Sequence, residues 1–201
     1  MLTIALPKGR IAEQTLEKFE KVFDEKFVFE DRKLILKKAG FTFLNVRNQD
    51  VPTYVMHGAA DLGVVGLDVL EEKEYDLIKL LDLKIGQCKV AIGLKAGDTI
   101  DWSKSEITVA TKHTTIAKRF FESKAMAVNI VKLYGSIELA PLVGLADCIV
   151  DIVETGETMK QNGLEVGETI MQSSVFLISN KNSYYNQKTE ILDLREQLAS
   201  T

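Results

Sequence analysis

Apolar, strand-like runs alternate with helix-like segments along this chain, and the alternation limits the folds that it can adopt. The cycle is clearest from Ile107 to Val150. In that part we expect strands over 107–110, 127–131 and 148–150, and helices over 114–123 and 137–145. Because parallel neighbours need a crossover connection between them, this order predicts an α/β fold with mainly parallel sheets.

The first part of the chain follows the same plan. A buried strand over 2–6 precedes a helix whose apolar residues recur at helical spacing, namely Ala12, Leu16, Phe19 and Phe23. Further strands are expected over 33–36, 41–46, 62–65, 77–83, 89–94 and 174–179, and further helices over 51–56 and 189–198.

These elements predict two lobes with a cleft between them, an architecture like that of type II periplasmic binding proteins. Residues 1–88 with 174–201 form lobe I, and residues 89–173 form lobe II. An internal echo supports a common plan, since the spacing of Gly58, Ala60, Asp61 and Val64 returns in Gly144, Ala146, Asp147 and Val150.

Composition excludes several classes of protein. The formal net charge of −4 over 201 residues argues against a general nucleic-acid binder. Cys88 and Cys148 lie in apolar runs without metal-ligand spacing, so we expect reduced core residues. The N-terminus lacks a signal-peptide pattern, and no apolar run approaches the roughly 18 residues of a membrane span. The expected location is the cytoplasm.

The stretch DIVETGETM, from Asp151 to Met159, predicts a phosphate site. It reads as the end of a strand, an acidic residue and a Thr/Gly-rich turn that opens into a helix. Such a turn directs backbone N–H groups, the hydroxyls of Thr155 and Thr158, and the positive end of a helix dipole at one point. Since Asp151 suits sugar hydroxyls, the pattern favours a ribose 5-phosphate pocket. The alternative is an ordinary capped turn.

A basic turn, LPKGR, places Lys8 and Arg10 around Gly9 directly after the first strand. Two cations at the carboxyl end of a strand provide a second anion site, unless the turn is simply solvated. Arg32 and Arg47 flank strands of the first lobe, and they would matter only as a convergent pair.

The remaining motifs are less specific. In DLGVVGLD, over 61–68, Gly63 and Gly66 allow close approach of either a ligand or a helix. The chain has neither a Walker GxxxxGK[ST] motif nor a GxGxxG motif after a strand. His57 is expected at a helix end. His113, in TKHTT, lies either in a third ligand-facing turn or at an ordinary helix start.

Taken together, four segments resemble the ATP phosphoribosyltransferase family, which catalyses the entry step of histidine biosynthesis. They are LPKGR, DLGVVGLD, GQCKVAIGL and YGSIELAPLVGLADCIVDIVETGETM. The resemblance covers essentially the whole chain. Its most specific part is a set of residues at fixed spacings, namely Glu138, Gly144, Asp151, Thr155, Gly156 and Thr158.

The resemblance implies transfer of the 5-phosphoribosyl group from phosphoribosyl pyrophosphate to N1 of ATP, with Mg²⁺ bound through the substrate phosphates. It assigns the ribose hydroxyls to Asp151 and the pyrophosphate to Lys8, Gly9 and Arg10. The 5-phosphate is assigned to the turn of Glu154, Thr155, Gly156, Glu157 and Thr158. Arg32 and Arg47 would meet the ATP phosphates or the leaving group, and further substrate-binding positions are Asp68, Thr111 and Glu138.

The chain departs from the family pattern at one turn. An aromatic residue followed by proline usually stands where this chain has His113 and Thr114, which leaves the adenine contacts there open. The chain resembles the short form, which lacks a C-terminal regulatory domain and works with a regulatory subunit similar to histidyl-tRNA synthetase. We therefore expect a homodimer that joins a hetero-oligomer, and a chain that alone is insensitive to histidine.

Two rival functions remain open from the sequence. A two-lobe architecture also suits a non-catalytic solute- or nucleotide-binding module. A phosphoribosyltransferase that accepts another base is disfavoured, because the common nucleotide-salvage type has two adjacent acidic residues before its turn, whereas Ile152 follows Asp151 here.

Overall fold

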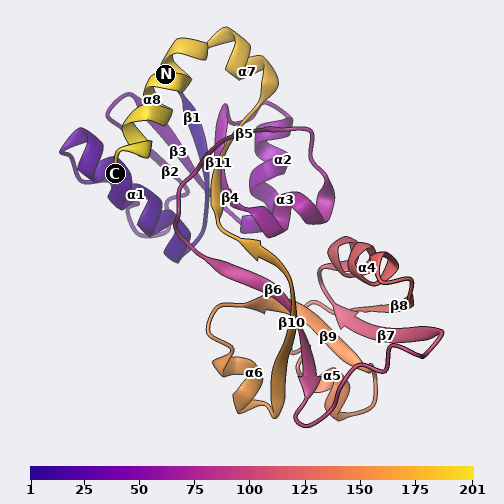
Figure 1. Cartoon of the computed structure of the whole chain (residues 1–201). Helices are drawn as coiled ribbons and strands as arrows, with labels where there is room; N and C mark the ends of the chain where they lie inside the picture. The colour runs from indigo at the N-terminus through magenta and orange to yellow at the C-terminus, as the bar shows by residue number, and fades with distance from the viewer. The chain divides into compact units, whose positions relative to one another are not determined.

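The computed structural model describes residues 1–201, which divide into two compact units (Figure 1). Unit 1 comprises residues 1–86 and 174–201, and unit 2 comprises residues 87–173. None of the helices is long and apolar enough to cross a lipid bilayer.

Unit 1 contains a sheet with the strand order β2-β3-β1-β4-β11-β5. Its strands are β1 (Thr3–Pro7), β2 (Ile35–Lys38), β3 (Phe41–Val46), β4 (Leu62–Gly66), β5 (Ile78–Asp82) and β11 (Val175–Ser179). Its helices are α1 (Arg10–Phe23), η1 (Asn48–Asp50), α2 (Val51–Met56), α3 (Leu67–Lys73), α7 (Lys181–Asn186) and α8 (Lys188–Ala199).

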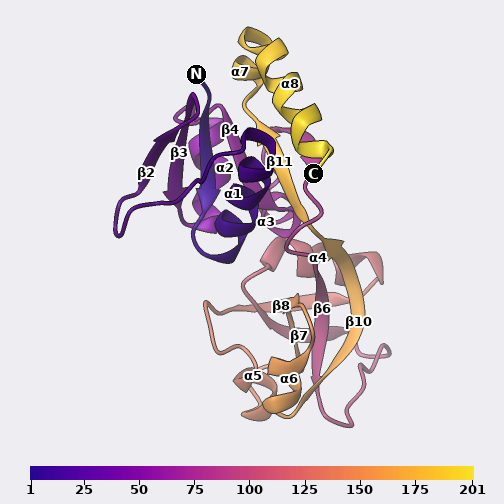
Figure 2. The same cartoon turned by 90° about the vertical axis from the view of Figure 1, so that its left-hand side faces the viewer.

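Helices cover both faces of the unit 1 sheet (Figure 2). Alternate residues of each strand point to opposite faces, so Ile4 packs with α1 and α8 while its neighbour Ala5 packs with α2 and α3. Gly63 is required by the second face, because a Cβ there would lie 2.6 Å from the Val55 side chain on α2. Close helix packing, and not ligand approach, therefore explains this glycine.

Unit 2 contains a sheet with the strand order β10-β6-β9-β7-β8. Its strands are β6 (Cys88–Lys95), β7 (Glu106–Thr111), β8 (Ala127–Lys132), β9 (Cys148–Val153) and β10 (Leu164–Ser173). Helix α4 (Thr114–Ser123) packs on one face, and α5 (Leu139–Leu142) and α6 (Glu157–Gln161) pack on the other.

Both sheets are mixed, and the parallel pairing predicted from the sequence is limited to three adjacent strands of each. In unit 1, β1 pairs in parallel with β3 and β4; in unit 2, β7 pairs in parallel with β8 and β9. The other pairings are antiparallel. The expected α/β class is confirmed, and the helices predicted over 51–56 and 114–123 have those bounds.

The internal echo has a structural basis in a repeated hydrogen-bonded pair. In unit 1, Asp61 precedes β4 and exchanges two bonds with Thr3: its N–H donates to the Thr3 carbonyl, and its carboxylate accepts from the Thr3 N–H, both at 2.8 Å. In unit 2, Asp147 precedes β9 and bonds Thr108 in the same way, at 2.8 and 2.7 Å. Each aspartate fixes where one parallel strand begins beside its neighbour.

Three predicted elements were wrong in extent. The strand expected over 33–36 is β2, which spans Ile35–Lys38. The helix expected over 137–145 is the single turn α5, and the strand expected over 148–150 continues to Val153. Pro141 interrupts the backbone hydrogen bonding of the helix expected over 137–145, and Gly144 adopts a positive φ of 74° that ends it. Strand β9 continues past residue 150 because it pairs with β6 up to the Lys89–Val153 pair. The local sequence pattern does not reveal this partner strand.

Candidate functional site

In unit 1, the polar residues singled out from the sequence follow the carboxyl ends of three neighbouring strands, β1, β3 and β4. Lys8 follows β1 and Arg47 follows β3. The two turns are joined directly, because the Lys8 N–H donates to the carbonyl of Val46 at 2.8 Å. Parallel strands end at one edge of their sheet, so this edge brings the basic turn and Arg47 together.

The turn of Lys8, Gly9 and Arg10 leads into helix α1. Gly9 is the N-cap residue with φ of 91°, a conformation that favours glycine, and no side chain caps the helix. Lys8 and Arg10 are both exposed. A helix N-terminus with exposed cations on either side of its cap is an electrostatically favourable place for an anion.

The arginine pair is placed less closely. Arg47 is exposed at the end of β3, whereas Arg32 is exposed in the loop that leads to β2. No described contact joins the two side chains. Their convergence on one ligand therefore stays a prediction.

Asp68 lies at the start of α3, just beyond β4, and is buried. Its Oδ1 occupies the space above Gly66, since a Cβ on that glycine would lie 2.3 Å away. This explains the glycine at position 66: a side chain there would displace the carboxylate.

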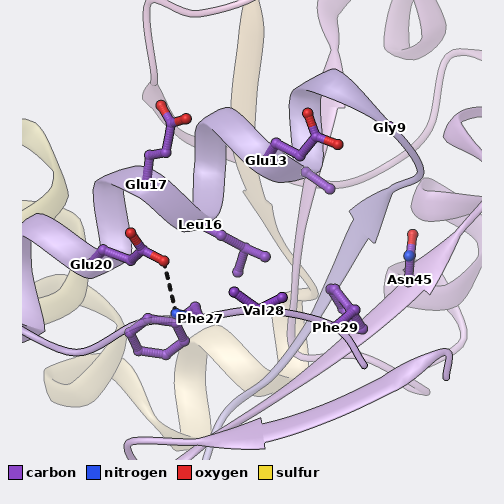
Figure 3. Close-up of a pocket in the computed structure, with 10 residues that line it drawn as sticks. Gly9, Glu13, Leu16, Glu17, Glu20, Phe27, Val28, Phe29 and Asn45 are labelled. Carbon is purple, nitrogen blue, oxygen red and sulfur yellow. Dashed lines mark hydrogen bonds between the residues drawn. The ribbon is translucent and has the colours of Figure 1, made fainter. Parts of the chain in front are cut away.

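A pocket of about 360 Å³ in unit 1 adjoins the basic turn but does not suit a phosphate (Figure 3). Leu16, Phe27 and Phe29 give it an apolar lining. The carboxylates of Glu13 and Glu17 on α1 stand along it, and Glu20 accepts a hydrogen bond from the Phe27 N–H at 2.9 Å. Anionic side chains along a pocket disfavour an anionic ligand, so this pocket does not account for the phosphate site predicted at residues 8–10.

In unit 2, the acidic residue and the Thr/Gly-rich turn both belong to β9 and its continuation. The sequence led us to expect that Asp151 ends the strand. Instead, Asp151 lies within β9 and pairs with Ala91 of β6. Its side chain is 19% exposed. The turn follows at residues 154–156, directly after Val153, and leads into α6.

The turn itself has the conformation of a capped strand-to-helix connection. Gly156 is the N-cap residue with φ of 83°, and the Thr155 hydroxyl accepts a hydrogen bond from the Glu157 N–H at 3.3 Å. Helix α6 has only 5 residues, so its dipole contributes less than the sequence led us to expect. The donors that this turn offers a ligand are backbone N–H groups and the hydroxyls of Thr155 and Thr158, both exposed residues.

Thr111 ends β7 beside β9, and its fully buried hydroxyl lies within the sheet. The hydroxyl donates to the Val150 carbonyl at 2.6 Å and accepts from the His113 N–H at 2.8 Å. The Thr111 hydroxyl therefore bonds the backbone of Val150, the residue before Asp151, and not Asp151 itself.

The two residues after Thr111 reach Asp151 directly. Lys112 Nζ lies 3.2 Å from Asp151 Oδ1, and the buried ring of His113 places Nε2 3.8 Å from the same oxygen. Lys112 was missed in the sequence. The signal was the one that identified Lys8: a cation that directly follows the carboxyl end of a parallel strand.

The other residues considered from the sequence belong to other elements. Glu138 is the N-cap residue of α5, after β8, and is half-buried. His57 ends α2 and is exposed, as expected for a helix-end residue. Both cysteines are free, and burial raises the pKa of the Cys148 thiol to about 12, with a smaller effect from Asp147. A thiolate nucleophile at Cys148 is therefore excluded near neutral pH.

Comparison with known sequences gives one consistent result. A family model for ATP phosphoribosyltransferase matches residues 47–200. A protein of that name from Wolinella succinogenes is 65% identical over 199 residues, covering 99% of this chain and 97% of the relative. Another, from Sulfurovum sp. (strain NBC37-1), is 67% identical over 198 residues, covering 98% and 96%.

Comparison with solved structures separates fold from family. The ATP phosphoribosyl transferase (HisG:HisZ) complex from Thermotoga maritima contains a chain with 35% identity and a TM-score of 0.86, with coverage of 100% of this chain and 98% of that chain. The periplasmic aliphatic sulphonate binding protein SsuA from Escherichia coli has a TM-score of 0.64 at 14% identity, with coverage of 99% and 67%. The second likeness shows the fold alone, and it confirms the periplasmic-binding-protein-like architecture.

Proposed function

This chain belongs to the ATP phosphoribosyltransferase family, and we propose from that premise how its residues carry the reaction. The reaction transfers the 5-phosphoribosyl group from phosphoribosyl pyrophosphate to N1 of ATP, giving phosphoribosyl-ATP and pyrophosphate in histidine biosynthesis. The chain is therefore an enzyme, not the non-catalytic binding module considered as the alternative.

The edge of the unit 2 sheet at which the parallel strands β7 and β9 end would bind the ribose 5-phosphate group. The observation that carries this assignment is that Asp151 lies on β9 three residues before the turn that begins at Glu154. A carboxylate accepts hydrogen bonds from ribose hydroxyls, and the backbone N–H groups and threonine hydroxyls of the turn donate to the 5-phosphate. The remaining members of this set are Glu138, at the start of α5, and Thr111, which would act through Val150.

The edge of unit 1 would bind substrate phosphates. Lys8 and Arg10 flank the N-terminus of the 14-residue helix α1, so charge and backbone N–H groups favour the same anion. Arg47 follows the adjacent strand, and Arg32 would approach from its loop. Asp68, buried beneath the same edge, would support the backbone there rather than meet phosphate directly.

The chemistry needs stabilisation of charge more than acid–base catalysis. The bond from ribose C1 to the pyrophosphate oxygen breaks, the electron pair leaves with pyrophosphate, and the lone pair of adenine N1 forms the new bond to C1. N1 carries no proton in neutral adenine, so no general base is required. Preorganised donors and cations that stabilise the leaving group and orient the ribose then lower the barrier.

Mg²⁺ would enter as part of the substrates. The described chain has no group of three or more His, Cys, Asp or Glu side chains placed to hold a metal ion. Mg²⁺ commonly binds through substrate phosphates with few protein carboxylates, which agrees with this set of residues. Bound in this way, it would neutralise charge on the pyrophosphate.

The partner follows from the same family. The related Thermotoga maritima structure is a complex of HisG with HisZ. We accordingly propose that this chain forms a homodimer and a hetero-oligomer with a regulatory subunit, which the resemblance predicts to be similar to histidyl-tRNA synthetase. As a step of amino-acid biosynthesis, the reaction is proposed to take place in the cytoplasm.

The direct test is to mix the purified chain with ATP, phosphoribosyl pyrophosphate and Mg²⁺. Inorganic pyrophosphatase is added to draw the reaction forward, and the ultraviolet absorbance of the N1-ribosylated adenine is followed. The assay is run for the wild type, for Asp151→Asn and for the surface control Asp193→Asn, each with and without a regulatory subunit.

The expected result is product formation by the wild type and the control, with a rate reduced about 100-fold or more in Asp151→Asn. Equal rates for Asp151→Asn and wild type would reject the assigned role of Asp151. Saturable ligand binding with no pyrophosphate release, with or without the regulatory subunit, would reject the transferase activity itself.

A further inference from the structure

An ion pair joins Lys112, directly after the end of β7, to Asp151 on the neighbouring strand β9. The two atoms Nζ and Oδ1 lie 3.2 Å apart, and the side chains are only 34% and 19% exposed. Asp151 Oδ1 itself is buried and accepts no hydrogen bond. A buried carboxylate oxygen without a hydrogen-bond donor is costly unless a charge compensates it, and the nearest cation is Lys112.

The backbone on both sides of Lys112 is held in place. Thr111, before it, bonds the Val150 carbonyl, and the N–H of His113, after it, donates to the Thr111 hydroxyl. Three consecutive residues at the end of β7 thus contact two consecutive residues of β9. Lys112 therefore reaches Asp151 from a fixed origin and not from a mobile loop.

We infer that Lys112 is a positioning residue for phosphoribosyl pyrophosphate, which it affects through the carboxylate of Asp151. Its ammonium group holds the inner oxygen, Oδ1, so the carboxylate keeps one orientation and the more exposed part of the side chain is left for the ribose hydroxyls. This inference rests on the role proposed above for Asp151, and it assigns a function to a residue that neither the sequence motifs nor the family pattern singled out.

A merely structural ion pair in the same unit provides the matched control. Lys104 Nζ lies 3.1 Å from Asp147 Oδ1, with side chains 50% and 39% exposed. Asp147 directly precedes β9, so this pair lies at the start of the strand that contains Asp151. Removing either lysine breaks one Lys–Asp ion pair of unit 2, but of these two lysines only Lys112 contacts Asp151.

The test compares Lys112→Met, Lys112→Arg and Lys104→Met with the wild type in the transferase assay. For each protein, KM for phosphoribosyl pyrophosphate, KM for ATP, kcat and the melting temperature are measured. Calorimetric titration with phosphoribosyl pyrophosphate and Mg²⁺ measures binding independently of turnover.

For Lys112→Met we expect KM and Kd for phosphoribosyl pyrophosphate to rise about tenfold, because one charge-assisted contact to the ribose ligand is no longer held in place. KM for ATP should change less than about twofold. Lys112→Arg should recover most of the loss, since it keeps the charge. Lys104→Met should keep wild-type kinetics, with a melting temperature similar to that of Lys112→Met.

Two results would overturn the inference. One is unchanged affinity for phosphoribosyl pyrophosphate in Lys112→Met, and the other is an equal loss in Lys104→Met. The Asp151→Asn variant separates this failure from failure of the proposed site. If Asp151→Asn loses activity while Lys112→Met does not, only the role of Lys112 is rejected; if both behave as wild type, the site assignment is rejected with it.

Discussion

At the scale of single residues, Thr111 shows how a residue predicted to bind substrate can have its side chain bonded within the sheet instead. Its resemblance to a family position implied substrate binding. In the structure its hydroxyl is buried and bonded to Val150 and His113, and the side chain that reaches Asp151 comes from the next residue, Lys112. Residue identity and spacing predicted a site at this turn, but only the register of β7 against β9 shows which side chain makes which contact.

Gly156 offers a test of the phosphate turn. Alanine at this position is strained by the positive φ of 83°, at a cost of about 1–2 kcal/mol, and its Cβ would lie 3.1 Å from the Val166 side chain. We expect Gly156→Ala to raise KM for phosphoribosyl pyrophosphate about tenfold, because the turn must change shape. Steady-state kinetics with varied phosphoribosyl pyrophosphate measure the effect.

Gly163→Ala is the control for this strain. Gly163 has a similar φ of 75°, lies two residues after α6 and has open space at its Cβ position. It should lose comparable stability and keep its kinetics. If both variants show the same KM, the turn has no special role in binding phosphoribosyl pyrophosphate.

Asp147 gives a pH-dependent prediction. The hydrogen bond from the Thr108 N–H lowers the pKa of Asp147 below the ordinary 3.8; burial partly opposes this shift, and Lys104 lowers the pKa by a smaller amount. Because the pKa is lower in the folded state, the stabilisation is present above the unfolded pKa of about 3.9 and is lost as pH falls through the folded value. Asp147→Asn should lower the free energy of unfolding at pH 7 by about 1 kcal/mol, a value discounted for partial exposure.

Urea unfolding at pH 7, 5, 4 and 3 measures this effect. The difference in unfolding free energy between wild type and Asp147→Asn should stay constant from pH 7 to 5 and shrink below pH 4. Asp193→Asn, an exposed position on α8, should differ from wild type by less than about 0.5 kcal/mol throughout. A difference that grows as pH falls would contradict the sign of the pKa shift.

At the scale of elements, helix α1 illustrates why part of the fold could be predicted. Ala12, Leu16 and Phe19 recur at helical spacing and are all buried. The Phe19 ring is fully buried and meets Phe43 edge-to-face at 5.1 Å, within a group of aromatic rings that joins α1 to β3. Periodicity is a local property, so it could be identified before the partner strand was known.

The same contacts predict that Phe19→Ala destabilises unit 1. Replacing a fully buried phenylalanine by alanine lowers the free energy of unfolding by about 3–5 kcal/mol, because buried apolar surface is lost and a cavity is left behind. Tyr185→Ala on α7 is the control because its side chain is largely exposed, and it should change stability by less than about 0.5 kcal/mol. Chemical denaturation followed by circular dichroism measures both. A cost below about 1 kcal/mol for Phe19→Ala would mean that the ring does not anchor α1.

Other elements could not be predicted because their signals are not local. Strand β10, from Leu164 to Ser173, has few buried residues and shifts register against β6, so its sequence lacks regular alternation. The helix predicted over 137–145 has apolar residues at suitable spacing, but Leu139, Leu142, Val143 and Leu145 remain exposed. Spacing alone does not show which apolar residues a neighbouring element covers.

At the scale of the whole molecule, the two units share one order of parallel strands. In each, the first strand lies between the second and the third: β3-β1-β4 in unit 1 and β8-β7-β9 in unit 2. An antiparallel strand then extends each sheet beyond the third strand, β11 beside β4 and β6 beside β9. The echoed aspartates, Asp61 and Asp147, mark the same step of this plan in both units.

The metal requirement is a prediction for the protein as a whole. Because no cluster of three candidate ligands exists in the described chain, we expect Mg²⁺ to bind only together with a phosphate substrate. Calorimetric titration of Mg²⁺ into the chain alone should give no saturable heat below about 1 mM, and EDTA should abolish turnover until Mg²⁺ is restored. Tight stoichiometric binding of Mg²⁺ without substrate would contradict this.

The sequence by itself determined the α/β class, most central strands and helices, the family, and the turns at residues 8–10 and 154–158. Each follows from local periodicity, from turn residues such as Gly9 and Gly156, or from motifs at fixed spacing. The tertiary structure decided what depends on partners distant in the chain. It showed the mixed pairing of the sheets, the extension of β9 past Asp151, the burial of Thr111 and the ion pair of Lys112, because pairing between strands sets register, and register sets which side chains meet.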